Sequence, residues 1–222
     1  DVYKRQKLKK DIPEIGEDIK VMGLRRGKDI SLTIATAMIS GLIPDKNHYI
    51  SVIEDAKKRV EDFSSKITDM NVKLKINPAD DYEKGVFYLT VTGTSAEAGD
   101  DGNTGRGNRL NGLITPLRQY SMEASAGKNP VNHTGKLFNI LAQRTADKIY
   151  DKVKGIKEVY VRLLSCIGNP IDQPQIASVA MILEGSMSLS SIKTDIESIT
   201  EEQISKITDL TPMILSGSIL LF

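Results

Sequence analysis

Residues 18–38 read DIKVMGLRRGKDISLTIATAM, and their apolar side chains recur at every second position. Ile19 and Val21 come before a turn at residues 25–28, and the same period resumes after it at Ile30. A period of two is typical of strands that bury one face, and a short polar turn between two such runs is typical of a hairpin. The stretch therefore predicts a β-hairpin, around which the rest of the first unit is organised.

A helix is expected over residues 46–69, because apolar residues recur there at alternating spacings of four and three and so form one stripe. They are Tyr49, Ile53, Ala56, Val60, Phe63 and Ile67. Residues 72–76 and 86–91 are β-branched or alternating in character and predict two further strands. The first 92 residues thus have the order β-β-α-β-β, which predicts a sheet with a helix on one face.

A second unit is predicted to start near Gly135. Its expected elements are a helix over residues 136–153, strands over 158–165 and 176–183, and a helix over 190–210 that Pro212 should end. Strands and helices occur in both units, and the predicted fold class is α+β.

Residues 93–135 differ from both flanks. They hold eight of the 17 glycines of the chain, a density that suits a backbone approaching a ligand closely better than a packed element. Acidic residues come first, and the stretch from Arg106 to Lys136 then holds five basic residues against the single acidic Glu123; they are Arg106, Arg109, Arg118, Lys128 and Lys136. Free amides with Arg and Lys suit a polyphosphate, and nearby carboxylates suit Mg2+. The same composition also fits a plain solvated loop.

The overall composition argues against a nucleic-acid-binding protein and against a membrane-spanning protein. A net charge of +1 gives no overall field for nucleic acid, and the basic run lacks the interleaved aromatics of a base-stacking surface. No apolar run approaches the ~20 residues that a membrane-spanning helix needs. The single cysteine, Cys166, fits a reducing compartment. We therefore expect a cytoplasmic protein that binds neither nucleic acid nor membrane.

Several runs together resemble the archaeal type of methionine adenosyltransferase (S-adenosylmethionine synthetase). They are GTSAEAGDDG at 93–102, GRGNR at 105–109, NGLITP at 111–116 and AGKNPVNH at 126–133, with GEDIKVMGL at 16–24 and IGNPI at 167–171 on either side. The resemblance extends from about Leu8 to the C-terminus and corresponds to the C-terminal half of that enzyme. Such long and unusual runs are far more specific than a lone Gly-Lys pair.

The resemblance implies formation of S-adenosylmethionine from ATP and L-methionine with release of phosphate and pyrophosphate. It implies Mg2+ and K+ as cofactors, a homodimer with active sites shared between subunits, and a fold of three similar domains with repeated βαβ-type units. Expected here are an α/β unit at 7–93, a substrate-binding segment at 94–135 and a C-terminal α/β unit at 136–222. Arg106 and Lys128 would clamp the triphosphate, and Asp100 would lie at the methionine or ribose end. The weaker candidates for the polar shell are Asp101, Gly105, Asn108, Asn129, Asn132 and His133.

Some residues depart from the family pattern, and at these positions the roles of the family's residues are not assigned to this chain. Gly107 stands where the bacterial motif has lysine, and Thr134 lies near the place of a bacterial acidic residue, so the metal ligands stay unassigned. The family's Gly-His-Pro-Asp and Gly-Gln-Gly-Ser motifs, which supply a catalytic histidine, a magnesium ligand and ATP contacts, are absent from these 222 residues. We therefore expect a fragment that is inactive alone.

Other functions stay open alongside the transferase. His133 suits a structural hydrogen bond better than a general base. A P-loop nucleotide-binding enzyme is disfavoured, because Asn129 follows Gly127 and Lys128 where that motif needs Ser or Thr. A non-catalytic nucleotide-binding or interaction module is the alternative from another class.

Overall fold

The computed structural model describes residues 2–94, 110, 117, 119, 121 and 125–221, with side chains from Lys7 onward. The chain divides into two compact units. The described residues up to Thr94, together with Cys166–Gly168, form the first unit, and the remaining residues form the second.

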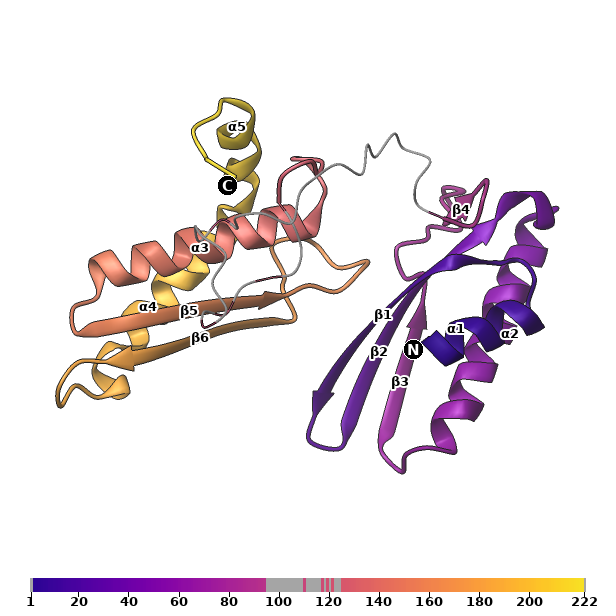
Figure 1. Cartoon of the computed structure of the whole chain (residues 1–222), viewed down its shortest axis with the longest axis horizontal. Helices are drawn as coiled ribbons and strands as arrows, with labels where there is room; N and C mark the ends of the chain where they lie inside the picture. The colour runs from indigo at the N-terminus through magenta and orange to yellow at the C-terminus, as the bar shows by residue number, and fades with distance from the viewer. Residues whose placement is uncertain are drawn as a thin grey trace. The chain divides into compact units, whose positions relative to one another are not determined.

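The first unit is built on a sheet with two helices beside it (Figure 1). Its elements are α1 (Val2–Asp11), β1 (Ile15–Arg26), β2 (Asp29–Ile39), a 3-10 turn at Ser40–Leu42, α2 (Lys46–Ser65), β3 (Asn71–Ile76) and β4 (Leu89–Thr90). β1 and β2 pair antiparallel across the turn that follows Arg26, which confirms the predicted hairpin. β3 and β4 both pair with β2 in parallel. α2 connects β2 to β3, as a crossover between parallel strands requires.

The core of the first unit lies between the sheet and the helices. It combines one face of the hairpin, including Ile15, Ile34 and Met38, with Tyr49 and Ala56 from the predicted stripe of α2. Leu8 of α1 packs against this core, although the sequence analysis did not predict a helix at residues 2–11. The order β-β-α-β-β is therefore confirmed, with one extra helix before it.

Two predicted boundaries in the first unit are wrong. α2 ends at Ser65 rather than at residue 69, because the N–H groups of Lys66 and Ile67 turn back to the carbonyls three residues earlier and tighten the last turn. Ile67 is accordingly 60% exposed and lies outside the core. The strand predicted over 86–91 shrinks to Leu89–Thr90, because Val86 pairs with Asp81 across a tight turn instead of joining the sheet.

The described part of the second unit packs three helices with a two-stranded antiparallel sheet (Figure 1). Its elements are α3 (Thr134–Lys152), β5 (Ile156–Leu164), β6 (Ile176–Leu183), α4 (Leu189–Ser205), a 3-10 turn at Ile207–Asp209 and α5 (Leu210–Leu215). Val159 and Val161 of β5 lie opposite Met181 and Val179 of β6 and pack, with residues of α3 and α4, around the buried Ile149. The predicted helix over 136–153 and the predicted strands over 158–165 and 176–183 are present within two residues of their expected bounds.

The described part of the second unit differs from the first in its order, which is α-β-β-α-α. The prediction that Pro212 ends a helix is wrong, because Pro212 lies inside α5. A proline in the first turn of a helix removes no intrahelical hydrogen bond, since the first N–H groups have no partner there. The predicted helix over 190–210 ends instead at Ser205, and the chain restarts in α5 around the buried Leu210.

Candidate functional site

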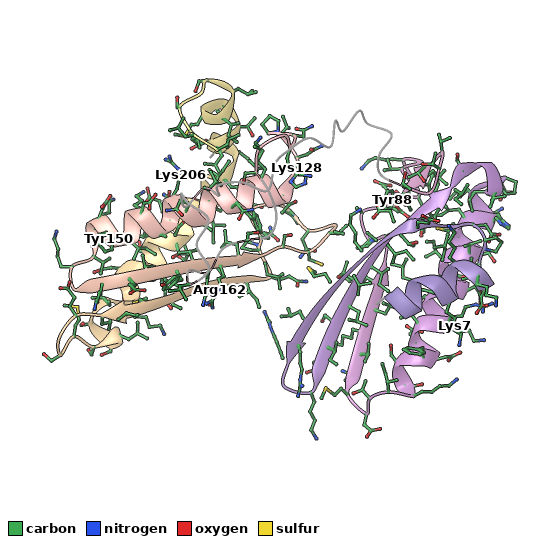
Figure 2. All side chains as sticks on the ribbon, in the orientation of Figure 1. Lys7, Tyr88, Lys128, Tyr150, Arg162 and Lys206 are labelled. Atoms are coloured by element: carbon green, nitrogen blue, oxygen red, sulfur yellow. The ribbon has the colours of Figure 1, made fainter. Side chains whose placement is uncertain are left out.

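Residues 125–133 lie in the longest described run of the predicted phosphate-binding segment, just before α3, and we call them the Lys128 loop. The loop leads directly into α3, and Figure 2 shows Lys128 near the end of α3 at which the chain enters the helix. Gly127 adopts a φ of 73°, in the left-handed region that glycine enters without a steric penalty. Lys128 is half-buried, whereas Asn129 and Asn132 are exposed.

Local hydrogen bonds fix the backbone of the Lys128 loop. The Asn129 Oδ1 atom accepts the N–H of Val131 at 2.8 Å, which makes a turn closed by a side chain. The backbone N–H of His133 returns to the carbonyl of Asn129 at 3.3 Å. The Thr211 hydroxyl from α5 donates to the carbonyl of Pro130 at 2.9 Å. The loop is therefore tied both to itself and to a distant part of the same unit.

His133 caps the start of α3. Its Nδ1 atom accepts the backbone N–H of Lys136 at 3.1 Å, and its carbonyl accepts the N–H of Leu137. A ring nitrogen that accepts a hydrogen bond carries no proton, so this cap requires the neutral ring with its proton on Nε2. The cap is the structural role that the sequence left open beside a catalytic one.

Lys136 belongs to the basic run of the sequence but is not among the nine predicted site residues. Its side chain is only 4% exposed, and its Nζ atom donates to the carbonyl oxygen of Lys128 at 2.8 Å. Burial lowers the pKa of the Lys136 ammonium, and among the residues that the structure describes no acidic group offsets that effect. A signal was present in the sequence, because Lys136 stands four residues before the core residue Ile140 and so lies on the buried face of α3.

The first unit fixes the start of the same glycine-rich segment. Gly93 follows β4, and a Cβ atom placed on Gly16 would lie 2.2 Å from the Gly93 carbonyl oxygen. The Thr90 hydroxyl accepts the N–H of Gly93 at 2.9 Å, and the N–H of Asp18 donates to the Gly93 carbonyl at 3.1 Å. The run that begins GTS at residue 93 therefore leaves the sheet from a fixed position.

Four of the nine predicted site residues, Lys128, Asn129, Asn132 and His133, are neighbours in the Lys128 loop. The other five lie outside the described residues; they are Asp100, Asp101, Gly105, Arg106 and Asn108. The pairing of Arg106 with Lys128 around one ligand accordingly stays a prediction.

No three His, Cys, Asp or Glu side chains gather as a metal site within the described part of the chain. The described helices also include none that is both long and apolar enough to cross a bilayer.

The profile of the S-adenosylmethionine synthetase (AdoMet synthetase) family matches residues 1–218. This chain belongs to the S-adenosylmethionine synthetase family. The match includes residues 1–7, at which the resemblance seen in the sequence had not yet begun.

Curated relatives of this synthetase family carry the name S-adenosylmethionine synthase. The protein from Pyrobaculum islandicum is 54% identical over 228 aligned residues, which cover 100% of this chain and 56% of the relative. The protein from Sulfurisphaera tokodaii is 55% identical over 218 residues, which cover 98% of this chain and 54% of the relative. The chain thus spans just over half the length of these relatives.

Proposed function

We propose that this chain supplies the triphosphate-binding part of an enzyme that makes S-adenosylmethionine from ATP and L-methionine. The observation that carries the proposal is the family match over residues 1–218, which includes a loop that presents Lys128 on a hydrogen-bonded backbone. A cation on a fixed loop suits an anionic ligand, because little order has to be gained when the ligand binds.

The proposed chemistry is a single displacement followed by hydrolysis. The methionine sulfur attacks C5′ of ATP, a sulfur–carbon bond forms, and the C5′–oxygen bond breaks with its electron pair leaving on the triphosphate. Water then divides the triphosphate into pyrophosphate and phosphate. A neutral sulfur needs alignment more than activation, so the protein's main task is to stabilise the charge of the leaving group.

The proposed role of each site residue in binding the substrates follows from its charge and its position in the sequence. Lys128 and Arg106 would hold the triphosphate oxygens, and Asp100 would lie at the methionine or ribose end. The amide side chains of Asn129 and Asn132 could donate to phosphate oxygens from the exposed side of the loop. The remaining contacts of the polar shell are proposed for Asp101, Gly105, Asn108 and His133.

The cofactors and the assembly are part of the proposal. Mg2+ would neutralise phosphate charge, and the carboxylates of Asp100 and Asp101 have the oxygen chemistry that Mg2+ prefers. The described residues supply no metal ligand set, so no step is assigned to Mg2+ or to K+. We further propose a cytoplasmic homodimer, with active sites between subunits and three similar domains in the complete protein.

Titration with tripolyphosphate tests the proposed site. Calorimetry on the wild-type chain should show binding, and Lys128→Ala should weaken it at least about tenfold, which corresponds to ~1.4 kcal/mol. Lys193→Ala is the matched control, since it removes one positive charge from a side chain of the same unit that is 64% exposed. Equal losses in the two variants would indicate a general charge effect and would contradict the proposed site.

A further inference from the structure

Lys136 is an unusual lysine because it is buried at the first turn of a helix. Lysine is rarely buried unless it is paired, and the side chain here is 4% exposed. Its one partner among the described residues is a main-chain oxygen, that of Lys128, at 2.8 Å. Desolvating an amine to reach a carbonyl eight residues earlier is costly, so the contact calls for a reason beyond the stability of α3.

We propose that Lys136 is a positioning residue that fixes Lys128 for binding a polyphosphate. Three contacts converge on the few residues between them. The Lys136 side chain donates a hydrogen bond to the Lys128 carbonyl, and the Lys136 backbone N–H donates to the His133 ring. The Asn129 side chain closes the turn in the stretch between Lys128 and Lys136. This inference rests on the proposed function, because it assigns a residue that supports the same site.

The hydrogen bond persists in either protonation state of Lys136. An ammonium and a neutral amine both carry an N–H that can donate to the Lys128 carbonyl. The direction of the pKa shift, which favours the neutral amine, therefore does not weaken the contact.

The role predicts coupling between Lys136 and Lys128. Lys136→Met keeps a long unbranched side chain in the buried position but cannot donate a hydrogen bond. Calorimetric titration of the full chain with tripolyphosphate should give about tenfold weaker binding for Lys136→Met. In a Lys128→Ala background the same change should have little further effect, because residues that act through one another are not additive. Lys136→Arg, which restores a donor, should recover part of the affinity.

A second measurement, amide hydrogen exchange, reports directly on the order of the Lys128 loop. Hydrogen exchange at the Val131 and His133 amides should accelerate in Lys136→Met, while exchange at Thr145 in the middle of α3 stays as in the wild type. Thr145 is buried, and its backbone belongs to the same helix, so its amide reports whether α3 remains folded.

The outcomes separate this inference from the proposed function. Wild-type affinity in Lys136→Met, equal effects of Lys136→Met with and without Lys128, or unchanged exchange at Val131 would each overturn the positioning role while leaving the site intact. If instead the wild-type chain binds tripolyphosphate no better than Lys128→Ala does, both the proposed site and the role of Lys136 fall.

Discussion

Asn77 shows how one side chain organises the first unit. It has a φ of 44°, a left-handed backbone that non-glycine residues seldom adopt, and it is 4% exposed. Its Oδ1 atom accepts the Thr36 N–H at 2.8 Å, and its Nδ2 atom donates to the Thr36 carbonyl and to the Tyr49 hydroxyl at 3.0 Å. Tyr49 in turn donates to Asp80 at 2.6 Å, so β2, α2 and the segment after β3 meet at this point.

Replacing Asn77 should be costly for stability. Asn77→Ala leaves the buried Thr36 peptide groups without partners and puts alanine in a strained backbone, which should lower the free energy of unfolding by about 3 kcal/mol. Asn47→Ala, on the exposed side of α2, is the matched control and should change stability by less than about 0.5 kcal/mol. Chemical denaturation of both variants measures the difference, and similar midpoints would show that the Asn77 network contributes little.

Periodicity predicted the elements better than it predicted their ends. The alternation around Ile19 and Ile34 placed the hairpin correctly, because its apolar side chains do pack on one face. The bounds near Ile67 and Val86 were missed because both residues are apolar yet exposed, at 60% and 52%, and pattern alone does not reveal how the chain turns. Lys136 was counted in the basic run but missed as a site residue, because a pattern of charges does not show that one of its lysines is buried.

α3 and α4 are joined by an ion-pair network centred on Glu202. Its carboxylate accepts from Lys148 of α3 and from Lys206 at the end of α4, each at 2.8 Å. These two hydrogen bonds lower the pKa of Glu202 from 4.5 to about 2. A carboxyl group whose pKa is lower in the folded state stabilises the fold above its unfolded pKa and loses that contribution as the pH falls.

The network should therefore give a pH-dependent stability. At pH 6 the wild type should melt at a higher temperature than Glu202→Gln, and this gap should close as the pH falls from about 4.5 to about 2. Because the pair is solvent-accessible, 1 M salt should also narrow the gap. Thermal melts of both proteins at several pH values test this, and a gap that stays constant down to pH 2 would contradict it.

If the proposed function is right, the complete reaction needs residues that this chain does not contain. The chain spans 54% to 56% of the two relatives described above, and the Gly-His-Pro-Asp and Gly-Gln-Gly-Ser motifs of the family do not occur in it. The charge clamp around Lys128 would stabilise a leaving group, but alignment of methionine with ATP would require the other part of the enzyme.

Incubation of the purified chain with ATP, L-methionine, Mg2+ and K+ should therefore give no S-adenosylmethionine. Chromatographic detection of the product measures this, with a full-length relative such as the Pyrobaculum islandicum protein as the positive control. Turnover at a rate comparable to that of the control would show that the catalytic groups had been placed in the wrong part of the enzyme.

The glycine-dense segment and the Lys128 loop are proposed to hold a polyphosphate. The most direct test is a structure of this chain crystallised with tripolyphosphate. Phosphate oxygens should lie about 3 Å from the Lys128 Nζ atom and from the Arg106 guanidinium, with the Lys136 contact to the Lys128 carbonyl retained. Tripolyphosphate bound elsewhere, with Lys128 and Arg106 apart from it, would show that these residues do not form the polyphosphate site.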